Sequence, residues 1–96
     1  MRIFGKGILG EFTKKHNDAQ AKIEAWNAET LKSEWEKPQD IIDRYPSAHI
    51  VQNKVVFKIK GNHYRLVVNL DYDEKIVMVL FAGTHDEYDD INVVDL

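Results

Sequence analysis

Side chains able to bind an anion gather in one short stretch of this 96-residue chain: Lys58, Lys60, His63 and Arg65. Between them, Gly61-Asn62 is a dipeptide suited to a two-residue hairpin turn. Pairing the flanking strands about this turn places Lys60 opposite His63 and Lys58 opposite Arg65, with apolar residues on the other face. Because like charges directly across a strand pair destabilise it, we expect this face to hold an anion such as a nucleic-acid backbone. A solvated strand face is the alternative, and a one-residue slip in register would invert the two faces.

A second group of reactive side chains follows in Thr84-His85-Asp86-Glu87-Tyr88. The pattern has the form of a capping box that opens a helical turn, and it places His85 and Tyr88 on one face. Histidine transfers protons near neutral pH, and tyrosine donates a hydrogen bond or stacks on a base. A helix N-terminus also favours phosphate. The alternative is a surface cap with Tyr88 packed on the edge of the sheet.

The remaining candidate residues favour structural roles. His16 lies at the break between two predicted helices and is expected to cap or pack. His49 precedes a strand and has no evident partner, so no function is expected of it. Trp26 and Trp35 have apolar neighbours at helical spacing and are expected in the core. No HExxH, paired-histidine or calcium-loop pattern is present, and neither a metal nor another cofactor is expected.

Composition indicates one domain over residues 1–96, with 44% hydrophobic and 30% charged residues. The net charge of −3 argues against a simple nucleic-acid binder, but the charge is unevenly distributed. Residues 49–65 carry Lys and Arg without any acid, whereas residues 86–95 carry five acids without Lys or Arg. The lack of cysteine fits a reducing cytoplasm, and neither a signal peptide nor a transmembrane run is apparent.

Hydrophobic periodicity predicts an α+β fold in which helices cover one face of a small antiparallel sheet. The other face is expected to be free and to carry the basic residues. Helices are expected over about 7–16, from an Asp18 cap to about residue 35, and from Pro38 through residue 42, with a last helical turn from Thr84. Strands are expected over 2–4, 55–60, 63–70 and 76–81.

With these residues in place, the chain resembles the HigB toxin family of small RelE-like endoribonucleases from bacterial type II toxin–antitoxin modules. The most specific similarity lies in residues 55–67, VVFKIKGNHYRLV, and residues 83–89, GTHDEYD. Weaker similarity is carried by residues 1–4, Phe12, 16–19, Trp26, Trp35, Pro38 and 40–41. The acidic net charge departs from the family, as does Asn17 where a proline is common.

The resemblance implies a RelE-like fold and an mRNA interferase that cuts message on the ribosome without a metal. The ribose 2′-hydroxyl would attack the adjacent phosphate and release a 5′-hydroxyl. Arg65 matches the arginine that would stabilise the phosphate, and His85 and Tyr88 match a His-x-x-Tyr pair. His85 would be the general acid or base, and Tyr88 would orient the RNA. The residues expected to position the RNA are Lys58, Lys60, Asn62 and His63.

The resemblance also implies a cognate helix-turn-helix antitoxin as partner. Two other functions stay open from the sequence. The chain could dock on RNA or the ribosome without cutting, or it could pair only with an antitoxin.

Overall fold

The computed structural model describes residues 1–96 and confirms the α+β class. The strands are β1 (Arg2–Phe4), β2 (His49–Val51), β3 (Lys54–Ile59), β4 (Tyr64–Asp71) and β5 (Ile76–Thr84). The helices are α1 (Lys6–Lys15), α2 (Gln20–Lys32), α3 (Pro38–Arg44) and α4 (His85–Asp89). Two 3-10 turns complete the chain, η1 (Asn17–Ala19) and η2 (Val93–Asp95).

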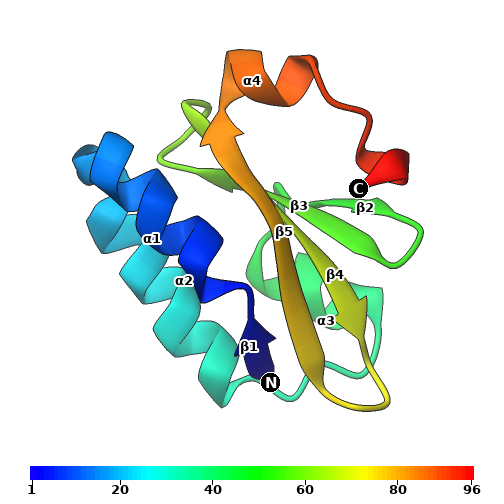
Figure 1. The fold of residues 1–96 in the computed structure, drawn as a ribbon. Coiled ribbons are helices and arrows are strands. Elements are labelled where there is room, and N and C mark those ends of the chain that lie inside the picture. Colours follow the sequence, from blue (N-terminus) through cyan, green and yellow to red (C-terminus); the bar gives the residue numbers. More distant parts are fainter.

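The sheet has the strand order β1-β5-β4-β3-β2 and is mixed, not wholly antiparallel as expected. Strands β2 to β5 follow one another as antiparallel neighbours, whereas β1 pairs in parallel with β5. A parallel pair cannot be joined by a tight turn, and here the connection contains three helices and three strands. Figure 1 shows α1 and α2 side by side along the sheet, and α4 at the far end of β5.

One hydrophobic core lies between the helices and one face of the sheet. It contains Leu9 and Phe12 of α1, Ile23 and Trp26 of α2, and every second residue of the central strands. Phe57 of β3 is at its centre, with ring centroids 5.6 Å from Trp26, 6.5 Å from Trp35 and 5.2 Å from Tyr45. The core positions predicted for both tryptophans are confirmed.

The helices differ from the prediction mainly at their ends. Asp18 does not cap α2, because its carboxylate instead accepts hydrogen bonds from Lys60 and Tyr64. The chain makes the 3-10 turn η1 first, and α2 then ends at Lys32, before Trp35. The predicted helix at Pro38 is confirmed, with the proline in its first turn.

Strand β5 runs to Thr84, beyond its predicted end at residue 81, and the strands differ from the prediction in two further ways. Strand β2 was not predicted, and it pairs with β3 across the turn at Gln52 and Asn53. The ladder between β3 and β4 ends at the pair Ile59–Tyr64, so Lys60 and His63 belong to a four-residue turn and not to the strands. The predicted pairing of Lys60 with His63 was therefore wrong, whereas that of Lys58 with Arg65 is confirmed.

Gly5 connects β1 to α1 where the chain passes close to β5. Its φ is +86°, a left-handed conformation that a side chain disfavours. A Cβ at this position would lie 2.7 Å from the carbonyl oxygen of Val79. The sequence therefore needs glycine here if α1 is to lie against the sheet.

None of the helices has the length and apolar character needed to span a bilayer.

Candidate active site

The pairing of β3 with β4 places Lys58 directly opposite Arg65. Side chains alternate between the two faces of a strand. Since Phe57 and Ile59 point into the helical core, Lys58 and Arg65 point to the opposite face of the sheet. The sequence predicted this arrangement.

Arg65 is buried and firmly oriented, with only 7% of its surface exposed. One terminal nitrogen donates to the carbonyl oxygens of Asn62 and Tyr64, each at 3.2 Å, and the other donates to Asn62 Oδ1 at 2.9 Å. Three of its five N–H groups are thereby used within the hairpin. Asn62 thus orients the guanidinium group, in addition to being a predicted RNA contact.

Helix α4 brings Tyr88 over this guanidinium group, at 5.8 Å from the Arg65 carbon to the ring centroid. The predicted capping box is confirmed: Glu87 N–H donates to Thr84 Oγ1 at 3.1 Å, and Thr84 N–H donates to Glu87 Oε1 at 2.8 Å. The bonds from Thr84 lower the pKa of Glu87. The cap fixes the direction in which α4 leaves β5 and hence the position of Tyr88.

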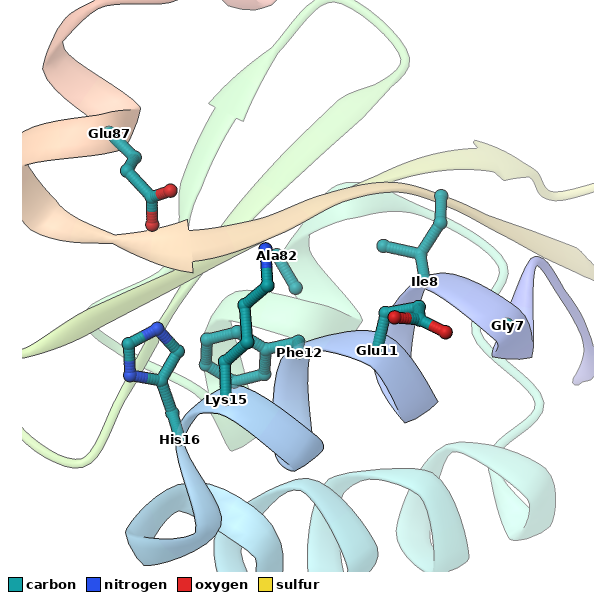
Figure 2. Close-up of a pocket in the computed structure, with 8 residues that line it drawn as sticks. All are labelled: Gly7, Ile8, Glu11, Phe12, Lys15, His16, Ala82 and Glu87. Atoms are coloured by element: carbon teal, nitrogen blue, oxygen red, sulfur yellow. The ribbon is translucent and has the colours of Figure 1, made fainter.

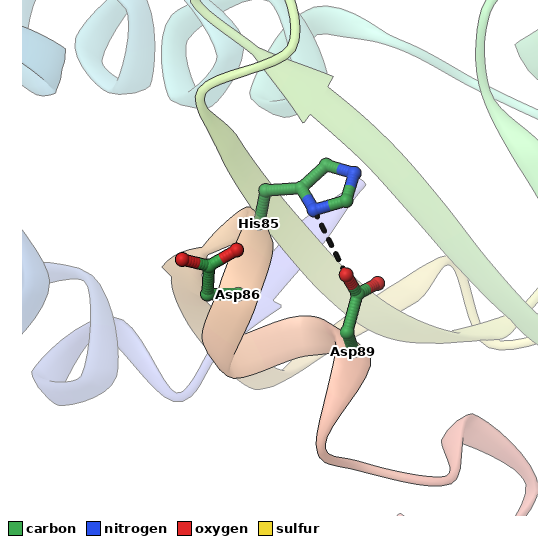
Figure 3. Close-up of side chains that lie close together, drawn as sticks. All are labelled: His85, Asp86 and Asp89. Carbon is green, nitrogen blue, oxygen red and sulfur yellow. Dashed lines mark ion pairs between the residues drawn. The ribbon is translucent and has the colours of Figure 1, made fainter.

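His85 opens α4, and its backbone N–H donates to the carbonyl oxygen of His63 at 3.0 Å. Figure 3 shows its ring beside Asp89, with Nδ1 lying 3.0 Å from a carboxylate oxygen. With Nδ1 beside the carboxylate, Nε2 of the ring is left for another partner. This arrangement suits an imidazole that exchanges protons through Nε2.

A hollow of about 310 Å³ on this face gathers several of the predicted residues. Its lining is Ser47, Ala48, His49, Val56, Lys58, Arg65 and Tyr88. His85 does not line it but lies one helical turn before Tyr88. His49, which has no evident partner in the sequence, also lines the hollow and was not among the predicted site residues.

A signal for His49 was present in the sequence. Ile50 and Val51 are β-branched, which favours a strand, and Gln52-Asn53 can turn the chain into the predicted strand that follows. Pairing about that turn sets His49 opposite Val56 and so on the same face as Lys58.

A family model for the RelE-like toxic component of a toxin–antitoxin system matches residues 19–91, which is most of the chain. The chain belongs to the HigB toxin family. No curated protein matches it. The matched region contains every residue that lines the hollow, together with α4. Membership of the HigB family confirms the predicted resemblance and implies an antitoxin partner.

In this HigB family member the face expected to be free is partly covered by the C-terminal segment. Val93 of η2 is buried against Val56 and Val67, in a small cluster separate from the main core. Lys54 Nζ donates to the carbonyl oxygens of Val93, Val94 and Leu96 at 3.0, 2.9 and 2.6 Å. The end of the face near Lys58 and Arg65 is not covered by this segment and holds the hollow.

Three of the predicted RNA contacts, Lys60, Asn62 and His63, do not line the hollow. Of these, Asn62 is the residue that orients Arg65. Lys60 has a φ of +53°, and its ammonium group forms an ion pair with Asp18 at 2.8 Å, so it is directed toward η1 and not toward Lys58. His63 is exposed in the turn, with its ring centroid 6.2 Å from that of Tyr64.

A second hollow, of about 290 Å³, lies between α1 and the end of β5 (Figure 2). Its lining includes Phe12, Lys15, His16 and Glu87, and none of the predicted site residues. The His16 ring lies 5.2 Å from Phe12 and 5.0 Å from Tyr64, which confirms its predicted packing role.

His85, Asp86 and Asp89 place three possible metal-ligand atoms within 4.8 Å of one another. Asp86 and Asp89 are exposed, and Asp89 already pairs with His85. Since exposed acidic groups are often close together without binding an ion, we assign no metal to this group.

Proposed function

We propose that this toxin is an endoribonuclease that cleaves mRNA on the ribosome, in the cytoplasm, using no metal. The observation that carries the proposal is the convergence of Lys58, Arg65 and Tyr88 in one hollow, with an oriented imidazole one turn away. The two cations, Lys58 and Arg65, can bind a phosphate group. The Tyr88 hydroxyl and the His85 imidazole can transfer protons beside it.

In the proposed reaction the ribose 2′-oxygen forms a bond to phosphorus, and the bond from phosphorus to the 5′-oxygen breaks. The proton lost by the 2′-hydroxyl passes to a base, and an acid protonates the departing 5′-oxygen. The products are a 2′,3′-cyclic phosphate and a 5′-hydroxyl end, with no water consumed. His85 exchanges one of these protons through Nε2.

Charge develops on the phosphate oxygens as the bond to phosphorus forms, so fixed cations lower the barrier. Arg65 is suited to this role because its contacts with Asn62 and Tyr64 hold it in one orientation before substrate arrives. Tyr88 orients the RNA above it. Lys58 binds the backbone, and Lys60 and His63 contact the RNA beyond the hollow.

The test is induced expression in a bacterium, with growth and primer extension on an abundant message as readouts. We compare wild type with Arg65→Lys, His85→Ala and the control Lys14→Ala, which changes an exposed lysine of α1. Arg65→Lys keeps the charge but loses the two-pronged donor group. We expect losses of about 10²-fold or more in cleavage for Arg65→Lys and His85→Ala, and none for the control.

New 5′ ends that require translation and disappear in both variants would support the proposal. Normal growth and intact message with soluble wild-type protein would contradict it and favour binding to RNA or to an antitoxin without cleavage.

A further inference from the structure

His49 occupies one side of the hollow, at the edge of the sheet. It is the first residue of β2, and its partner in the ladder is Val56 of β3. Directly paired residues point to the same face. Since Val56 packs under Val93, away from the helical core, His49 also points away from that core. Its side chain is exposed at the hollow's rim.

The strand pairing places two cations next to His49. His49 pairs with Val56, two residues along β3 from Lys58, so it lies diagonally across from Lys58, which in turn pairs with Arg65 of β4. Tyr88 of α4 lies over Arg65. The imidazole of His49 and the residues of α4 therefore flank the two cations from different sides.

This arrangement places possible proton-transfer groups on opposite sides of the two cations, as an in-line phosphoryl transfer needs. The attacking and leaving oxygens lie on opposite sides of phosphorus, so the base and the acid must also approach from opposite sides. A phosphate held between Lys58 and Arg65 would have His49 toward the sheet edge and α4 toward the other side. His63 lies in the turn and His16 packs on the helical side, so neither histidine occupies the position opposite α4.

We propose that His49 is a second proton-transfer residue of this site. It takes the proton from the 2′-hydroxyl as that oxygen attacks phosphorus, and a group on α4 donates the proton that the departing 5′-oxygen needs. His49 returns its proton to solvent after the products leave. This role rests on the proposed ribonuclease function. The other titratable or charged groups that face the hollow are Lys58 from β3, Arg65 from β4 and Tyr88 from α4.

The experiment measures single-turnover cleavage of message by purified protein on programmed ribosomes, as a function of pH. The variants are His49→Ala and His49→Gln, of which the second keeps a side chain of similar polarity. The control is Asn53→Ala, in the turn of the same hairpin but at its other end. Binding is measured separately with a message that carries 2′-O-methyl groups in the decoded codon and has no nucleophile there.

Loss of a general acid or base costs about 10²- to 10⁴-fold in rate. We expect losses of this size for both His49 variants, loss of one limb of the pH–rate profile, and binding of the methylated message within about threefold of wild type. Exogenous imidazole should restore part of the rate to His49→Ala only. Asn53→Ala should behave as wild type.

Cleavage by His49→Ala at the wild-type rate would overturn the role of His49 alone. Equal losses of binding and cleavage would also overturn it, because His49 would then be an RNA contact only. A wild-type protein that binds ribosomes and never cleaves would instead overturn the proposed function, and the role of His49 with it.

Discussion

At the scale of single residues, Asp18 connects the helical layer to the hairpin that carries Arg65. Its carboxylate accepts hydrogen bonds from Lys60 Nζ at 2.8 Å and from the Tyr64 hydroxyl at 2.6 Å. Because both bonds favour the ionised form, they lower the pKa of Asp18 to about 2. The turn that contains Asn62 is thereby attached to η1 at its base.

This low pKa predicts how stability depends on pH. An unfolded Asp titrates near 3.8, whereas folded Asp18 titrates near a pKa of about 2. The stabilisation is therefore present above about pH 4 and is lost as the pH falls toward about 2. In this range the unfolded wild-type chain binds a fraction of a proton more at residue 18 than the folded chain does, and the difference is largest midway between the two pKa values. We expect its urea midpoint to fall more steeply with decreasing pH than that of Asp18→Asn. Parallel curves for the two proteins would contradict this expectation.

Lys60 shows why the directions of individual side chains could be predicted only in part from the sequence. Alternation along a strand correctly assigned Lys58 and Arg65 to one face. Lys60 was assigned by the same rule, but it has already left the strand, and its positive φ turns it toward Asp18. A distant acidic partner and a left-handed backbone conformation at a lysine are not evident from local sequence.

At the scale of elements, Gly5 and Gly10 form a matched pair for testing how α1 is positioned. Gly5 has a left-handed φ and faces the Val79 carbonyl, whereas Gly10 is within α1, and a Cβ added there would meet no atom within 4 Å. We expect Gly5→Ala to lower the free energy of unfolding by about 2 kcal/mol or more. Gly10→Ala should raise it by about 0.5–1 kcal/mol.

Urea denaturation of both variants beside wild type tests this pair. A neutral Gly5→Ala would mean that β1 and α1 can shift away from β5 at little cost.

The elements themselves were predicted to different degrees, for physical reasons. Helix α4 was predictable because a capping box is a local signal confined to Thr84 and Glu87. Strand β2 has three residues, too few for periodicity to be convincing, and it forms only because β3 offers an edge. His49 lines the hollow because β2 pairs with β3. Since β2 was not predicted, His49 was not predicted to lie there either.

At the scale of the whole molecule, a net charge of −3 coexists with a small basic hollow. Binding to RNA releases counterions in proportion to the number of phosphates contacted. With Lys58 and Arg65 as the cations of the hollow, few phosphates should be neutralised. We expect the logarithm of ribosome affinity to fall with the logarithm of salt concentration with a slope between about −1 and −3.

Affinity measured across a series of potassium chloride concentrations tests this expectation. Lys58→Ala should make the slope shallower by about 1, and Lys14→Ala should leave it unchanged. A much steeper slope in wild type would show that the RNA contacts cations well beyond the hollow.

The attachment of the C-terminal segment has an evolutionary consequence. Lys54 binds three main-chain carbonyl groups, and of the residues that supply them only Val93 is also buried. Every amino acid offers the same carbonyl, so mutations at Val94, Asp95 or Leu96 can accumulate without releasing the segment. The surface next to the hollow is thus free to diversify, and a lineage could acquire new partner specificity there while conserving one lysine and one valine.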